Sequence, residues 1–180
     1  MSDQTYIIKT ERLGLRLWIP SDTQSICDIN ADPQVMRHFP NTLSEEETLA
    51  MIDRINKHHT DHGYGLYATE ILETGEFIGF IGFAHPRFEA SFTPCIEIGW
   101  RLKASSWNQG YCTEGAMACL DYMKTNINYS EVYSWTSPSN KPSERIMQKI
   151  GMEKVGEFQH PLLDAEHALS QHLIYKKDIK

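Results

Sequence analysis

Three β-rich runs follow one another in the middle of the chain, and this arrangement constrains the fold more than any other feature of the sequence. The runs Leu66 to Ile71 and Phe77 to Phe83 are joined by Glu73-Thr74-Gly75-Glu76, which is typical of a hairpin turn in which glycine supplies the positive φ. A third run, Cys95 to Leu102, follows a loop that contains two prolines. The sequence therefore predicts an antiparallel meander.

Strand and helix patterns precede this meander. Residues 12–19 alternate with period two, which predicts a half-buried strand, and a helix is expected after Ser21. A second helix begins at Ser44, whose hydroxyl caps it while Glu47 reaches back as the capping-box partner, and it continues to about His59. The apolar positions of this second helix follow helical spacing: Leu49, Ile52 and Ile55.

Two more helices and three strands follow the meander. Helices are predicted over residues 113–126 and 141–150, with a short strand over 132–136 between them and two last strands over 152–158 and 168–176. The first of these helices has one apolar face: Ala116, Met117, Leu120, Met123 and Ile127. The order β-α-α-β-β-β-α-β-α-β-β predicts an α/β (α+β) fold with one mixed sheet and helices on its faces.

Composition indicates one domain over residues 1–180, because a chain of 180 residues with 41% hydrophobic residues is long enough for one core and short for two. The net charge of −7 argues against a nucleic-acid partner. Four cysteines without paired spacing indicate reduced thiols. Since the sequence has neither a secretion signal nor a run of about 18 apolar residues, we expect a soluble, cytoplasmic protein without a membrane partner.

The segment from Trp107 to Glu114 lies between a predicted strand and a predicted helix, where backbone amides point outward unpaired. Gly110 lacks the Cβ that would block a close approach, so successive N–H groups can surround a pyrophosphate near the positive end of the helix dipole. Taken alone, however, one glycine before a helix favours a tight turn. The segment indicates an anion site that needs further support.

That support comes from three blocks that together resemble the GNAT superfamily of N-acetyltransferases, in particular the branch that acetylates alanine or serine at ribosomal-protein N-termini. The blocks are Glu97-Ile98-Gly99-Trp100-Arg101-Leu102, Trp107 to Ala116, and Asn140-Lys141-Pro142-Ser143 leading to Lys149-Ile150-Gly151-Met152. Their order and spacing are similar to those of the family. The resemblance implies a mostly antiparallel sheet with helices on both faces, in which a bulge in the fourth strand splays the sheet at its fourth and fifth strands.

The resemblance also implies that acetyl-CoA is the co-substrate and that no metal takes part. Backbone groups of Trp100, Arg101 and Leu102 would pair with the pantetheine arm, and Asn140 would hold it from the opposite side. Backbone amides of one loop would contact the pyrophosphate: Gln109, Gly110, Tyr111, Cys112 and Thr113.

Two catalytic residues are implied by the same resemblance. Glu97 resembles a carboxylate that acts as a base through water, and the alternative is an exposed glutamate that balances Arg101. Ser143 resembles the serine proposed in this branch to protonate the CoA sulfur, and the alternative is helix capping beside Pro142. The tyrosine that many family members use as general acid would fall at Met147, which has no proton to donate.

The implied reaction is transfer of an acetyl group from acetyl-CoA to a primary amine, on a protein N-terminus or a small molecule, by direct attack in a ternary complex. Met147 leaves an alternative open, a non-catalytic acyl-CoA-binding regulatory module. A thiol nucleophile at Cys112 is disfavoured, because the family places that side chain beside phosphate. Both a monomer and a homodimer fit the resemblance.

Acceptor specificity is expected from residues 36–40, the end of the second helix near Tyr64, and the loop over residues 85–93. Their aromatic side chains are explained equally well as a packed lid. His160 and His172 lie in strands that border the acceptor cleft in this family, where a structural role is favoured over proton transfer.

His58 and His62 stand four residues apart in the second predicted helix and could share one face as metal ligands. No neighbouring Glu or Cys in the sequence completes such a site. The sequence therefore favours a solvated helix end.

Overall fold

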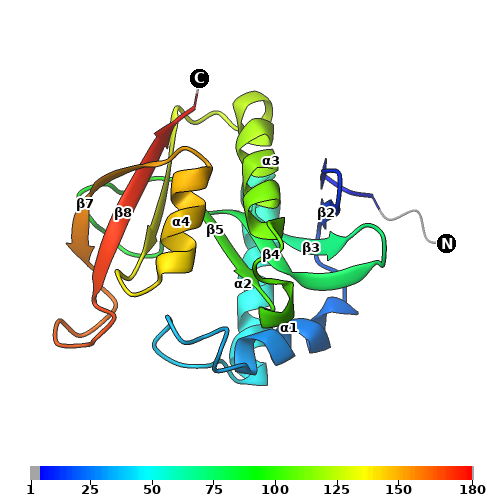
Figure 1. Cartoon of the computed structure of the whole chain (residues 1–180), viewed down its shortest axis with the longest axis horizontal. Helices are drawn as coiled ribbons and strands as arrows, with labels where there is room; N and C mark the ends of the chain where they lie inside the picture. Colours follow the sequence, from blue (N-terminus) through cyan, green and yellow to red (C-terminus); the bar gives the residue numbers. More distant parts are fainter. Residues whose placement is uncertain (1–4, 180) are drawn as a thin grey trace.

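A computed structural model describes residues 5–179, which form one eight-stranded sheet with four α-helices and one short 3-10 helix (Figure 1). In chain order, the elements are β1 (Ile8–Lys9), β2 (Leu13–Arg16), α1 (Asp22–Ala31), α2 (Glu45–His62), β3 (Leu66–Ile71), β4 (Glu76–Ala84), β5 (Glu97–Leu102), η1 (Ala104–Ser106), α3 (Tyr111–Asn126), β6 (Glu131–Thr136), α4 (Lys141–Lys149), β7 (Glu153–Gln159) and β8 (Gln171–Asp178). None of the helices in this part of the chain combines the length and apolar character needed to span a bilayer.

The strands lie in the order β1-β2-β3-β4-β5-β6-β8-β7, and every neighbouring pair is antiparallel except β5 with β6. The predicted fold class is therefore confirmed. Strand β1 was not predicted, because two residues are too few to show an alternating pattern. It raises the strand numbers by one, so the predicted fourth and fifth strands are β5 and β6.

The sheet opens between β5 and β6. Only Glu97 and Tyr133 are paired across these strands, and the Tyr133 N–H donates to the Ile96 carbonyl oxygen at 2.9 Å. Strands β4 and β5 pair along the whole of β5 without a shift in register, so the pairing does not contain the bulge that the resemblance implied. The splay is confirmed, and it results from the divergence of β5 and β6 beyond their one paired position.

Helices cover both faces of the sheet, with α3 and α4 in front and α2 behind in Figure 1. The predicted capping box of α2 is confirmed: the Glu47 N–H donates to Ser44 Oγ at 3.1 Å, and the Ser44 N–H donates to Glu47 Oε2 at 2.7 Å. Helix α2 runs three residues beyond the predicted His59 and ends at Gly63, whose φ of 78° is the left-handed conformation common after a helix.

Two predicted core positions are wrong. Leu49 is 42% exposed and Met117 is 50% exposed, although both follow helical apolar spacing. Their places are taken by Thr48 in α2 and Cys119 in α3, which are fully buried. Thr48 is tolerated inside because its hydroxyl accepts a hydrogen bond from Asn30 Nδ2 of α1 at 3.1 Å. Apolarity alone did not reveal this polar contact between the helices.

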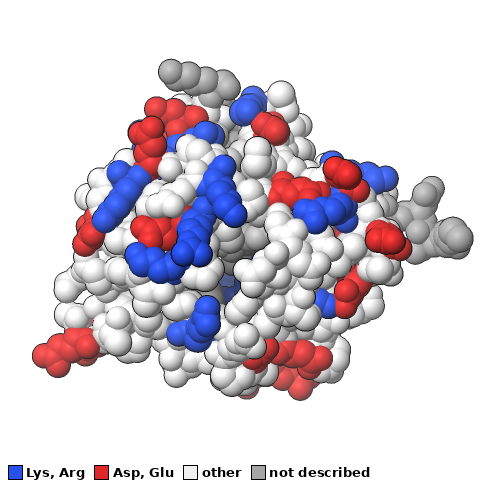
Figure 2. Space-filling view, in the orientation of Figure 1, with Lys and Arg blue, Asp and Glu red and all other residues white. Residues whose placement is uncertain are grey.

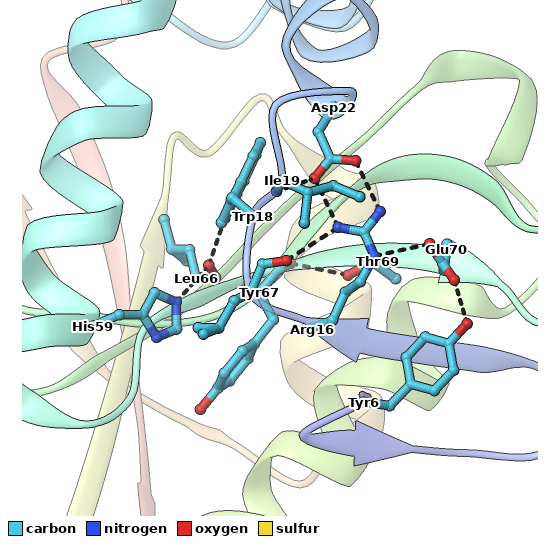
Figure 3. Close-up of polar contacts among 11 residues, drawn as sticks. Tyr6, Arg16, Trp18, Ile19, Asp22, His59, Leu66, Tyr67, Thr69 and Glu70 are labelled. Carbon is cyan, nitrogen blue, oxygen red and sulfur yellow. Dashed lines mark hydrogen bonds and ion pairs between the residues drawn. The ribbon is translucent and has the colours of Figure 1, made fainter. Parts of the chain in front are cut away.

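A buried ionic network joins β2, β3 and α1 (Figure 3). Arg16 donates to both carboxylate oxygens of Asp22 at 2.7 and 2.8 Å and to Glu70 at 2.9 Å. Tyr6 donates to the second oxygen of Glu70, and Asp22 also accepts from the Ile19 N–H at 2.9 Å. These contacts turn the chain into α1, so β2 ends at Arg16 and not at the predicted Ile19.

Replacing Arg16 by methionine should destabilise the protein by about 3–5 kcal/mol, because two carboxylates would remain buried without their counter-charge. Urea unfolding at pH 7 measures this change in the free energy of unfolding. Lys57→Met is the matched control, since the Lys57–Asp61 pair is on the solvent-exposed surface of α2 and should change the free energy of unfolding far less. Equal losses in the two variants would contradict a special role for the buried network.

Candidate active site

Two hollows meet where β5 and β6 diverge. The first has a volume of about 440 Å³ and lies beside the start of α3, and the second has a volume of about 560 Å³ and extends toward β6 and β8. Six residues line both hollows: His38, Phe39, Trp100, Arg101, Asn140 and Ser143. The two hollows therefore adjoin at the opening in the sheet.

Helix α3 presents its first amides to the first hollow. It begins at Tyr111, two residues earlier than predicted, because Gly110 adopts a φ of 81° as its N-cap. Within residues 5–179, no side chain caps this helix start. Gly110, Cys112 and Thr113 line the hollow, so unpaired N–H groups and the positive end of the helix dipole face its interior. This arrangement suits a phosphate group.

The side chains of Gln109 and Tyr111 hold this loop without lining the hollow. The side-chain amide of Gln109 donates to the Ser105 carbonyl oxygen at 3.1 Å, and the backbone carbonyl of Gln109 accepts from the Arg12 guanidinium at 2.9 Å. The Arg12 guanidinium also lies 4.6 Å from the centre of the Tyr111 ring and pairs with Glu114 at 2.6 Å. Arg12 carries no local sequence signal for this role, since it is far from the loop along the chain.

One edge of β5 faces the opening. The Ile96 carbonyl oxygen accepts a hydrogen bond from β6, and the N–H and C=O groups of successive residues in a strand point alternately to its two edges. The backbone groups of the even-numbered residues of β5 therefore point toward β6. These residues are Ile98, Trp100 and Leu102. The backbone of Arg101 instead points to β4, where it pairs with Phe80. Ile98 was not among the predicted residues, although the same alternation, applied to the sequence, identifies it.

Arg101 contributes its side chain to the floor of both hollows. Its guanidinium donates to Asn30 Oδ1 at 2.6 Å and lies 4.3 Å from the centre of the Phe39 ring. Burial lowers the pKa of Arg101 to about 10, so it keeps its charge at neutral pH. No ion pair links it to Glu97 among the described residues, so the alternative in which Glu97 balances Arg101 has no support in the contacts.

Glu97 is the first residue of β5 and the one residue of that strand that pairs with β6. Its side chain lines the second hollow. Its Oε1 lies 3.6 Å from where a Cβ on Gly99 would stand, so the absence of a side chain at Gly99 leaves room beside the carboxyl group. Burial raises the pKa of Glu97 to about 8. The group can therefore take up and release a proton near neutral pH, as a general base must.

Ser143 lies across the opening from β5, in the first turn of α4. Its Oγ accepts a hydrogen bond from the Trp100 indole at 3.4 Å. Helix capping is performed by Asn140, whose Oδ1 accepts from the Ser143 N–H at 3.4 Å, so Ser143 does not have the capping role weighed from the sequence. Met147 is buried one turn later and lines the second hollow. No tyrosine lines either hollow in the described part of the chain.

Basic side chains surround the first hollow, although the chain as a whole is acidic. Arg37, Arg145 and Lys149 line it. Figure 2 shows Lys and Arg side chains gathered on this face of the molecule, over the position of α4. The local positive charge adds to that of the α3 amides and favours an anionic ligand.

Cys112 also lines the first hollow. Burial raises the pKa of its thiol well above the usual range. The thiol is therefore protonated at neutral pH, which opposes the nucleophilic role considered from the sequence.

The segments expected to select the acceptor contribute unequally. Phe88 and Phe92 pack on the core of the C-terminal strands, with ring centres 5.5 Å and 5.8 Å from Trp135, which agrees with a packed lid. Arg87 of the same loop lines the second hollow. Tyr64 lies outside both hollows and is buried.

The second hollow also contains the two histidines singled out from the sequence, His160 and His172, whose ring centres are 5.1 Å apart. Burial lowers the pKa of both imidazoles. Burial therefore favours the neutral form of both imidazoles, which can pack against apolar groups.

Residues 12–153 match the family model described as an acetyltransferase (GNAT) domain. This span includes the opening between β5 and β6 and the six residues that line both hollows. The chain belongs to the GNAT acetyltransferase family. It is accordingly an acyl-CoA-dependent N-acetyltransferase, as the three sequence blocks indicated.

Individual relatives agree with this assignment. The chain is 31% identical over 153 residues to the uncharacterized N-acetyltransferase YnaD of Bacillus subtilis, covering 84% of this chain and 85% of that protein. A GNAT-family acetyltransferase structure from Bacillus anthracis superposes with a TM-score of 0.77 at 25% identity, covering 95% and 97% of the two chains. RimL, a ribosomal L7/L12 α-N-protein acetyltransferase solved with coenzyme A, has the same fold, with a TM-score of 0.75 at 16% identity and coverage of 94% and 96%.

The raised pKa of Glu97 predicts how Glu97→Gln changes stability with pH. Because the folded-state pKa of about 8 is above the unfolded value of about 4.3, the wild type loses stability as pH rises between these values, and the glutamine variant does not. Urea unfolding should therefore show the variant more stable than the wild type at pH 9, with a smaller difference at pH 5. A difference that does not change with pH would contradict a Glu97 that binds a proton with a raised pKa.

Proposed function

We propose that this enzyme transfers an acetyl group from acetyl-CoA to a primary amine by direct attack in a ternary complex. The observation that carries the proposal is the meeting of two hollows at the opening between β5 and β6, one beside uncapped helix amides and the other beside Glu97. We assign the first hollow to CoA and the second to the amine. We further propose a cytoplasmic enzyme, consistent with four free cysteines.

The residues around the first hollow fit CoA without a metal ion. The amides of residues 109–113 would bind the pyrophosphate, with Gly110 allowing the close approach and Arg145 and Lys149 adding positive charge. The open edge of β5 supplies backbone groups from Ile98, Trp100 and Leu102 for the amide groups of the pantetheine arm. Asn140 stands on the other side of the opening. The Arg101 backbone has its partner in β4, so its contribution comes from the side chain.

Glu97 accepts the proton of the attacking amine through water, because only the neutral amine is a nucleophile. A backbone N–H on the open edge of β5 stabilises the negative charge that develops on the thioester oxygen. As the C–N bond forms and the C–S bond breaks, Ser143 donates its hydroxyl proton to the departing sulfur and recovers one from solvent. Met147 cannot supply this proton, whereas Ser143 is the one residue of α4 with a side-chain hydroxyl and lines both hollows.

The acceptor is a primary amine on a protein N-terminus or a small molecule. RimL acts on the N-terminus of a ribosomal protein, and its shared fold supports including such peptides among the acceptors to test. The second hollow combines apolar walls, including Trp135 and Leu163, with Glu97 and Arg87. This lining suits an amine with an apolar group beside it.

Thiol release from acetyl-CoA, followed across ribosomal-protein N-terminal peptides, polyamines, amino acids and aminoglycosides, tests this function. With the best acceptor, kcat/KM should rise with pH toward a plateau above about pH 8, because the base works as the carboxylate of Glu97. Glu97→Gln should lower kcat by about 100-fold and remove this titration. An unchanged profile in Glu97→Gln would refute the assigned base.

Calorimetric titration with CoA accompanies the turnover assay. CoA binding without turnover of any acceptor would favour the regulatory module, whereas no binding would reject the use of the first hollow for CoA.

Thr113→Glu tests the position of the phosphates. A carboxylate in the first turn of α3 suits the helix dipole, so the fold should be as stable as in the wild type, yet it should weaken CoA binding at least about tenfold by repelling the pyrophosphate. Thr113→Gln is the matched control, with nearly the same shape and no charge. Equal CoA affinity in the glutamate and glutamine variants, measured by calorimetry, would overturn the placement.

A further inference from the structure

Three histidines form a cluster at the C-terminal end of α2, outside both hollows. His58 and His62 are one helical turn apart in α2, and His85 directly follows β4. One ring nitrogen of each lies within 4.8 Å of the others. We propose that this cluster is a binding site for a divalent transition-metal ion of the Zn²⁺ class.

The hydrogen bonding of His58 fixes one of its nitrogens as a potential ligand. Its Nδ1 lies 2.9 Å from the Tyr64 carbonyl oxygen, and since a carbonyl can only accept, Nδ1 carries the proton. The lone pair is therefore on Nε2, which is buried without a hydrogen-bond partner among the described residues. A metal ion would satisfy this nitrogen, and a ligating histidine typically has such a backbone contact at its other nitrogen.

His85 has a similar arrangement. Its Nε2 lies 2.9 Å from the Tyr64 hydroxyl, so the same residue orients two of the three rings. The Tyr64 hydroxyl oxygen can accept a hydrogen bond from the Nε2–H group of His85, and in that tautomer Nδ1 of His85 carries the lone pair and is the second potential ligand. The ring centre of His85 is 5.1 Å from that of His58 and 4.5 Å from that of His62.

His62 supplies the third imidazole, and its side chain is free to change orientation. It is the last residue of α2 and is exposed, so its side chain can rotate. Tetrahedral coordination at 2.0–2.1 Å places ligand nitrogens about 3.4 Å apart, so the ring nitrogens, which lie within 4.8 Å of one another, must move closer on binding, and rotation of His62 supplies part of this movement. Its exposed side also leaves a fourth coordination position open to water.

The composition of the cluster selects the class of ion. Three imidazoles without a carboxylate or thiolate suit Zn²⁺, Cu²⁺, Ni²⁺ or Co²⁺, whereas Mg²⁺ and Ca²⁺ prefer oxygen ligands. A bound ion would join the end of α2 to the loop that follows β4. That loop includes Arg87, which lines the second hollow, so the metal would fix one wall of the space assigned to the acceptor.

The sequence alone did not complete this site, because His85 is separated from α2 by the β3–β4 hairpin. Antiparallel pairing places Gly82 of β4 opposite Leu66 of β3, and β3 begins just after α2. The end of β4 is thereby returned to the end of α2.

The test is calorimetric titration of tag-free, chelator-treated protein with ZnCl₂, together with visible absorption after addition of Co²⁺. We expect one ion per chain and a Co²⁺ spectrum typical of nitrogen ligation in a site of low coordination number. His62→Gln and His85→Gln should each weaken Zn²⁺ binding at least about tenfold, because each removes one of three ligands.

His160→Gln is the matched control, since it disrupts the other close pair of histidines, His160 and His172, and should leave Zn²⁺ affinity unchanged. Circular dichroism of each variant verifies folding, and His62, being exposed, can be replaced without loss of core packing. Absence of Zn²⁺ binding to the wild type, or binding that persists unchanged in both His62→Gln and His85→Gln, would overturn the proposal. Neither outcome depends on acetyl transfer, so the metal site and the catalytic function are tested separately.

Discussion

The divergence of β5 and β6 is the constraint on which the rest of the structure depends. A strand inside a sheet normally satisfies its backbone groups on both sides, and β5 does so only toward β4. The single pairing at Glu97 and Tyr133 fixes where the opening begins, and α3 and α4 lie on either side of it. Both hollows, the exposed edge of β5 and the position of Glu97 follow from this one interruption in the ladder of hydrogen bonds.

Segments distant in sequence keep the opening in shape. The Arg101 guanidinium donates a hydrogen bond to Asn30 of α1 and lies against the Phe39 ring. His38, in the loop between α1 and α2, lies with its Nδ1 3.3 Å from Ser139 Oγ and so connects that loop to the loop before α4. The charged side chain of Arg101 is therefore positioned by contacts with residues outside the three sequence blocks typical of the family.

Local signals in the sequence predicted most of the fold, and long-range contacts account for what was missed. The α2 capping box and the β3–β4 turn depend on residues within four positions of one another, so they were readable. Three of the missed contacts join residues that are far apart in the sequence, so no local pattern indicates them. They are the ion pair of Arg12 with Glu114, the hydrogen bond of Arg101 to Asn30, and the approach of His85 to the end of α2. Periodicity likewise could not tell that the polar Thr48, and not Leu49, faces α1.

The single pairing between β5 and β6 also bears on how the chain folds. Strands β1 to β5 come from one continuous stretch of sequence and β6 to β8 from another, so most strand pairs within each half join neighbouring parts of the chain. Loop-closure entropy is lower for such pairings, so we expect them to form before the two halves join. The two halves of the sheet are then joined by one strand pairing, that of β5 with β6, and α3 is the segment of chain that connects them. The candidate active site lies at this junction, so we expect the cleft to form in the same event that completes the tertiary structure.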